Sequence, residues 1–349
     1  MKLNSFSQPL CLAFAGFSLL TAQGGDPIDF TNSGKEVDHH DTLWDSHRVD
    51  SHAPIGVMGD HTHEAGEWMV SYRYMSMDMG AQRDGTNDLT SAQLFGLGFP
   101  VAPTGMSMEM HMMGLMFAPT DNVTLMAMTG YEFNKMDHVT APGSPPRALM
   151  GPSFEMETEG WGDTTLGALV KFYDENHKRA HFNLAFSAPT GNLTNRAYPM
   201  HTGTGTWDLL PGVTYLWQDG LLSGGAQVLG RIHLGDNDYG YSNGDSIKGT
   251  GWLAYMLSDF LSLSGRLSLE NVGDINGFDT RFPGPGFMSP PMDAANHGGT
   301  WAEVGLGVNL LGNSGHRLAF EAVLPFHQDL NGPQMQRDWM FTVGWQKAF

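Results

Sequence analysis

The feature of this sequence that most restricts its fold is the alternation of apolar residues with polar or small ones, in segments separated by Gly, Pro, Asn and Asp. In the last segment, Trp339, Phe341, Val343 and Trp345 fall on one face. Neighbouring side chains of a strand point to opposite faces, so this pattern predicts β-strands that separate two environments. Twelve such segments lie near residues 66–79, 106–118, 123–136, 163–173, 180–190, 206–218, 221–234, 248–257, 260–270, 300–310, 316–327 and 337–349.

The connections between these segments alternate in length. Short turns, such as residues 119–122 and 258–259, alternate with long loops, such as residues 80–105 and 271–299. A soluble β-sandwich also has alternating strands, but it has no reason to sort its loops by length. An even number of strands with short periplasmic turns and long outer loops is typical of bacterial outer-membrane barrels. The sequence therefore predicts an all-β fold, a single-chain antiparallel transmembrane β-barrel of about twelve strands over residues 66–349.

The faces predicted to meet lipid support this fold. They carry almost no charge apart from Lys347 near the periplasmic end, and a Lys or Arg at mid-membrane would cost about 2–4 kcal/mol. Aromatic residues lie at both ends of these faces, as in an interfacial belt. The chain ends on Phe349, which resembles the C-terminal signal of outer-membrane barrels. The expected partners are therefore the outer-membrane lipid and, through Phe349, the barrel-assembly machinery.

The first 23 residues predict export from the cytoplasm. Lys2 precedes an apolar run over residues 9–20, a pattern typical of a signal peptide. Cys11, the only cysteine, lies in this segment, which excludes cysteine-based catalysis and cysteine-held zinc in the mature chain. With 18 basic and 37 acidic side chains, the formal charge of −19 argues against nucleic acid as a partner. The expected location is the outer membrane of a Gram-negative-type bacterium.

Twelve of the 23 methionines lie on one face of the first three predicted strands. One interpretation is that flexible methionines fill an irregular interior or line a path for hydrophobic compounds. The other is that their thioethers, which are soft ligands without a proton to lose, pass Cu(I) along the barrel wall. The candidate metal ligands on this face are Met69, Met75, Met77, Met106, Met108, Met110, Met112, Met126 and Met128.

Residues 24–65 lack the strand pattern and are rich in histidine and aspartate. They form either a solvated periplasmic arm, or a metal-capture arm or plug that folds into the lumen. Imidazole is a common ligand of Cu(II) and zinc, and the preferred site is His61 and His63 with Asp60 and Glu64. Further candidate ligands in this segment are His39, His40 and Met58.

Charged residues also occur on the predicted inner face, where buried charges need partners. We expect them to pair across the interior. The main ones are Asp163, Arg231, Arg266, Glu303 and Glu321.

Three motifs resemble a known family of outer-membrane transporters, named after the meta-pathway of phenol degradation. They are GDTTLGALVKF at residues 162–172, FSAPTGN at 186–192 and GTWDLLPGVTY at 205–215. The histidine-rich leader from residue 52 and the C-terminal segment 324–349 resemble the Met/His-rich branch of that family. The resemblance, which covers residues 52–349, implies a barrel and the passage of aromatic or other hydrophobic compounds.

Together these features predict a transporter or channel-like protein and not an enzyme, because neither a Gly-x-Ser-x-Gly elbow nor a phosphate loop occurs. The preferred cargo is copper, as Cu(I) or Cu(II), or another soft metal, with no required cofactor and with a periplasmic metal-delivery partner. The alternatives are a passive route for hydrophobic or aromatic compounds and a sealed structural barrel.

Overall fold

The computed structural model of the protein describes residues 44–194, 196, 198–282 and 287–349. The predicted signal peptide, His39 and His40 lie outside these residues. The strands are β1 (Trp68–Gly85), β2 (Asn87–Leu89), β3 (Val101–Thr120), β4 (Val123–Thr140), β5 (Ser153–Trp161), β6 (Thr164–Glu175), β7 (Lys178–Ala188), β8 (Trp207–Asp219), β9 (Leu222–Leu234), β10 (Tyr241–Ser242), β11 (Ser246–Ser258), β12 (Leu261–Val272), β13 (Asn276–Gly277), β14 (Gly299–Leu311) and β15 (His316–Ala348).

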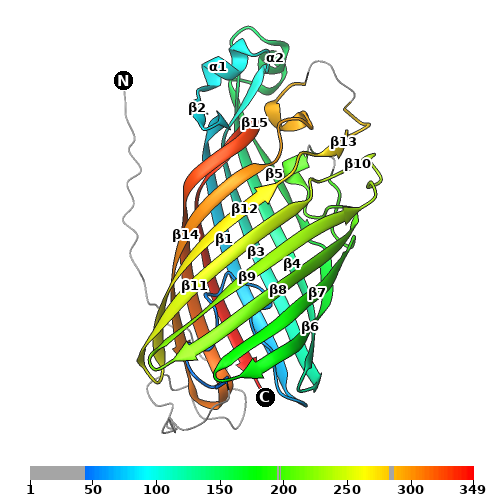
Figure 1. The fold of residues 1–349 in the computed structure, drawn as a ribbon. Coiled ribbons are helices and arrows are strands. Elements are labelled where there is room, and N and C mark those ends of the chain that lie inside the picture. Colours follow the sequence, from blue (N-terminus) through cyan, green and yellow to red (C-terminus); the bar gives the residue numbers. More distant parts are fainter. Residues whose placement is uncertain (1–43, 195, 197, 283–286) are drawn as a thin grey trace, which may run out of the picture.

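The fold is a closed antiparallel barrel (Figure 1). Eleven strands form a ring in the order β15-β14-β12-β11-β9-β8-β7-β6-β4-β3-β1, and pairing of β15 with β1 closes it. The long strand β15 forms two antiparallel passes of the barrel wall. Its residues 317–330 pair with β14, and its residues 330–348 pair with β1. Gly332, with φ of 74°, lies between these two halves, where the chain reverses. The barrel wall therefore has twelve passes, and the predicted fold class is confirmed.

The alternation separates an inner from an outer face, as the sequence predicts. On β3 and β4, Met113, Leu115, Leu125 and Phe133 are exposed on the outside. The methionines predicted to line the lumen lie on the opposite face of these strands; Met106, for example, is buried. Aromatic side chains such as Trp68 and Trp207 are exposed on the outer surface. In an outer-membrane barrel this outer face contacts lipid.

The outer end of the barrel differs from the predicted loops. Residues 80–105 and 137–162 are expected to be loops, but β1, β3 and β4 continue into them. Strand β5 pairs with β4 directly beyond β6, so β5 extends the β6 pass after a break at residues 162–163. Strand pairing can thus continue beyond the membrane. There both faces of a strand meet water, so the sequence no longer alternates between apolar and polar residues.

Short helices and strands cover this outer end (Figure 1). Thr90 begins one helix with a capping box, and Ser144 caps another that starts at Pro145. No helix within the described residues has both the length and the apolar character needed to cross a membrane. The helices are α1 (Ser91–Gly96), α2 (Pro145–Met150) and the 3-10 helices η1 (Tyr198–Met200), η2 (Pro290–Met292) and η3 (Asn313–Gly315).

Candidate functional site: a plug and a methionine wall

Residues 44–65, which we call the plug, lie inside the barrel near the end that carries the short turns and the C-terminus (Figure 1). Their backbone bonds to inward side chains from several sides of the wall. Ser262 of β12 donates to the Val49 carbonyl, and Asn183 of β7 donates to the Gly59 carbonyl at 2.7 Å. The described part of this segment is therefore bonded to the inner side of the barrel wall.

Strand β15 holds the middle of the plug. Glu321, which is 1% exposed, accepts hydrogen bonds from Arg266 Nε at 2.6 Å and from the Gly56 amide at 2.8 Å. Arg317 Nη2 donates to the Ala53 carbonyl at 2.8 Å. A plug without regular secondary structure thus has its backbone polar groups satisfied by the barrel wall.

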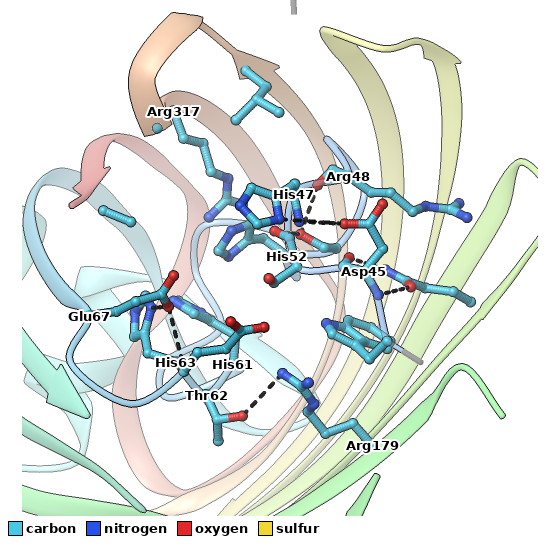
Figure 2. Close-up of a pocket in the computed structure, with 18 of the residues that line it drawn as sticks. Asp45, His47, Arg48, His52, His61, Thr62, His63, Glu67, Arg179 and Arg317 are labelled. Carbon is cyan, nitrogen blue, oxygen red and sulfur yellow. Dashed lines mark hydrogen bonds and ion pairs between the residues drawn. The ribbon is translucent and has the colours of Figure 1, made fainter. Parts of the chain in front are cut away.

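Three plug side chains form what we call the His–Asp cluster: His52, Asp60 and His61. Figure 2 shows the two histidines of this cluster. One ligand atom of each lies within 4.8 Å of the others. His61 Nδ1 is 2.8 Å from Asp60 Oδ1, and the Ala53 amide donates to Asp60 Oδ2 at 2.9 Å. The arrangement combines two imidazoles with one carboxylate.

The protonation of the cluster follows from its burial. Burial, aided by the nearby Arg317 charge, holds the pKa of His52 well below its usual value of 6.5. Burial also lowers the pKa of His61, against the opposing effect of Asp60. Burial opposes ionisation of Asp60, but the hydrogen bond with His61 and the nearby Arg317 charge favour the carboxylate, and the pKa of this carboxyl is lowered. At neutral pH the cluster therefore presents neutral imidazoles and a carboxylate.

The predicted site His61, His63, Asp60 and Glu64 is found only in part. His61 and His63 have ring centroids 5.0 Å apart, so these two rings do lie together. Glu64 is exposed, and the carboxylate that accepts from His63 Nδ1, at 3.3 Å, is that of Glu67. That hydrogen bond lowers the pKa of Glu67 to about 2. Met58 is also separate from the cluster, since its sulfur accepts from Arg73 of β1.

The inward-facing methionines of β1, β3 and β4 form what we call the methionine wall. Strand pairing sets them level with one another: Met69 with Met116 and Met126, Met75 with Met110, and Met77 with Met108. Met112 and Met128 lie between these levels, opposite Arg73 and Gly114 respectively. At the outer end, seven methionines pack into one cluster: Met79, Met106, Met108, Met136, Met156, Met200 and Met335.

A cavity adjoins the wall on each side of the plug. The outer cavity, about 320 Å³, is lined by Met110, Met112 and Met128 of the wall, by Met58 of the plug and by outer-loop residues such as Tyr198. The cavity at the other end, about 1320 Å³, is lined by Met69 and by His52, His61, His63 and Glu67. The wall thus runs past the plug from one cavity to the other.

The inward charges pair mainly with near neighbours. Arg231 lies 3.4 Å from Asp208, while Glu303 lies 3.1 Å from Arg337. Asp163 does not form the expected cross-barrel pair; it accepts hydrogen bonds from the amides of Gly191 and Thr204 and so joins two outer loops. Sequence reasoning placed these residues on the inner face but could not say which elements they would connect.

The closed antiparallel wall, with its apolar outer face and internal plug, is that of an outer-membrane β-barrel. A family model described as "Putative MetA-pathway of phenol degradation" matches residues 139–286, which confirms the resemblance noted in the sequence. No curated protein matches the chain.

Comparison with solved structures finds one that shares this fold and others that are less similar. An outer membrane channel from Pseudomonas putida F1 is similar over 84% of this chain and 99% of its own, with 14% identity and a TM-score of 0.60. The toluene transporter TodX of P. putida aligns over 82% of this chain and 91% of its own, with 10% identity and a TM-score of 0.39. The first likeness establishes the barrel fold.

Proposed function

We propose that this outer-membrane protein carries a soft metal ion, Cu(I) or Ag(I), along the methionine wall. The observation that carries the proposal is the pairing of Met69, Met75 and Met77 with methionines at the same level of β3. Inward residues of one strand follow one another at roughly 7 Å, so thioethers recur at short intervals along the wall. Soft thioethers favour Cu(I) over harder cations.

A row of similar sites suits transport better than one strong site would. Conduction requires binding that is favourable enough for the ion to enter but weak enough for it to leave. Thioethers are neutral and do not bind protons, so the wall would keep its ligands in acid. The cargo is carried without chemical change, and no enzymatic step is part of this proposal.

In this proposal the ion enters or leaves the methionine wall at the two cavities, one at the outer end and one at the periplasmic end. Met58 and Met112 line the outer cavity, whereas Met69 lines the periplasmic one. We propose that a periplasmic metal-delivery partner exchanges the ion at the second cavity. We also propose that Phe349, exposed at the C-terminus, is the residue through which the barrel-assembly machinery recognises the chain.

Replacing four wall methionines by leucine tests the metal proposal, because leucine keeps the volume and removes the sulfur. The variant is Met108→Leu, Met110→Leu, Met126→Leu and Met128→Leu, and the matched control is Met113→Leu on the lipid side. Cu(I) bound to the purified barrel, measured with a competing chelator, should fall severalfold in the variant and stay unchanged in the control. Equal binding by the fourfold variant and the wild type would contradict the proposal.

A second candidate cargo is an aromatic or other hydrophobic compound. The matching family takes its description from phenol degradation, and Tyr198 and Tyr241 join methionines around the outer cavity. This candidate predicts saturable uptake of phenol by liposomes that contain the barrel, with no effect of Cu(I). The fourfold leucine variant should retain that uptake, since leucine side chains are equally apolar.

A further inference from the structure

The His–Asp cluster has ring nitrogens that the rest of the described chain does not satisfy. His52 Nδ1 and His61 Nε2 are both buried without a hydrogen-bond partner among the described residues. Buried polar groups of native proteins nearly always have partners, so unpaired ones call for an explanation. Both rings stand beside the Asp60 carboxylate, whose Oδ2 lies 3.9 Å from His52 Nδ1.

We propose that His52, Asp60 and His61 bind one divalent transition-metal ion of the Zn(II) or Cu(II) class. Their ligand atoms are already within 4.8 Å of one another, which is close enough to share one ion after small side-chain movements. Two imidazoles and a carboxylate form a donor set that zinc and Cu(II) accept. This set contains no sulfur, and so differs in kind from the methionine wall.

The protonation of the cluster favours binding of a cation, but two nearby arginines oppose it. Metal ligands must be deprotonated, and the lowered pKa values of His52 and His61 remove the competing protons. The positive charges of Arg73 and Arg317 also interact with Asp60, and they would repel a metal ion bound to it. We therefore expect weaker binding than at a closed structural zinc site.

An ion can reach the cluster from the periplasmic side. His52 and His61 line the larger cavity, and the close-up in Figure 2 shows them with His63 and Glu67 around the same space. A ring nitrogen of His63, Nε2, is also buried without a partner among the described residues. It is the nearest additional imidazole, since its ring stands next to that of His61.

Occupation of the site would stabilise the plug in its position. All three ligands belong to residues 52–61, the same stretch in which Gly56 bonds to Glu321 and Gly59 accepts from Asn183. An ion held by both ends of this stretch would close it into a ring. The inference does not rest on the proposed cargo, because the site and the methionine wall share no residue.

Metal titration of the purified full-length barrel in detergent, first freed of metal with a chelator, tests the site. We expect calorimetry to show one Zn(II) bound per chain and an affinity at least tenfold lower for His52→Gln. His52 is the residue to change because its Nδ1 has no partner, whereas Asp60 also holds the Ala53 amide. His47→Gln, an exposed plug histidine, is the matched control and should bind like the wild type.

Two further readouts separate binding at this site from binding elsewhere. Zn(II) should slow hydrogen exchange of residues 44–65 in the wild type and in His47→Gln, but not in His52→Gln or His61→Gln. The fourfold leucine variant of the methionine wall should bind Zn(II) normally, so failure of the cargo proposal would leave this site intact. Absent Zn(II) and Cu(II) binding, or unchanged binding by His52→Gln, would overturn the inference.

Discussion

At the scale of single residues, Glu321 connects three parts of the molecule. Its two oxygens accept from Arg266 of β12 and from Gly56 of the plug, and its own backbone belongs to β15. Buried charges are tolerated when they are paired and hydrogen-bonded, as here. Glu321 is therefore both part of the wall and an anchor of the plug.

Glu321→Gln should destabilise the protein strongly. The amide would leave Arg266 as an uncompensated buried cation, and breaking such a pair costs about 3–5 kcal/mol. Urea unfolding in detergent should show a lower free energy of unfolding, and hydrogen exchange of residues 44–65 should accelerate. Glu175→Gln, at an exposed position, is the control and should change neither quantity. An unaltered plug in Glu321→Gln would contradict the anchoring role.

The buried imidazoles predict that acid releases the plug. Above pH 6.5 His52 and His61 are neutral whether the plug is docked or free, so their contribution is fully present. Below pH 6.5 the free plug takes up protons that the docked one resists, so docking weakens as the pH falls towards the lowered pKa values. Asp60 adds no pH dependence in this range, because its pKa lies below the usual 3.8. His63 and Arg317, which face the same groups, oppose protonation further.

Hydrogen exchange of residues 44–65 between pH 7.5 and 5, corrected for the intrinsic rate and with chelator present, measures this effect. Protection should fall with acid in the wild type, and the fall should be smaller in His52→Gln. Protection that increases towards pH 5 would contradict the predicted weakening of plug docking in acid.

At the scale of elements, the strands could be predicted, whereas the sequence left open whether residues 24–65 form an arm or a plug and gave no contacts for them. The alternation of apolar and polar residues identifies the inner face of β1, β3 and β4. It can be read from neighbouring residues alone, because successive side chains of a strand point to opposite faces. The position of residues 44–65 depends on scattered partners such as Asn183 and Glu321, which no local pattern connects to the plug. For the same reason Glu67 was missed as the partner of His63, although it lies only four residues away.

The fit of the plug against β15 depends on a residue without a side chain. A Cβ added to Gly344 would lie 2.7 Å from two side-chain atoms of Ile55, which is buried. Gly344→Val should therefore displace the plug and raise the ion conductance of the barrel in planar bilayers. The control Gly265→Val points into open space on β12 and should leave the conductance unchanged. Equal conductance of the two variants would argue that Ile55 does not seal the lumen.

At the scale of the whole molecule, the barrel places two cavities in series with the plug between them. The methionine wall is the part of the inner surface that adjoins both, through Met112 at the outer cavity and Met69 at the periplasmic one. A cargo that follows this wall must pass the level of the plug, so release of the plug and transport should be coupled. The barrel and its membrane location could be predicted from the sequence, whereas this serial arrangement required the tertiary contacts.

Flux of Ag(I), a redox-stable substitute for Cu(I), into liposomes containing the purified barrel tests the central claim most directly. The account predicts saturable entry of Ag(I) through the wild type and through Met113→Leu. It predicts at least a tenfold slower entry through the variant with Met108, Met110, Met126 and Met128 replaced by leucine. Equal flux through the wild type and the fourfold variant, or phenol uptake without any Ag(I) flux, would contradict it.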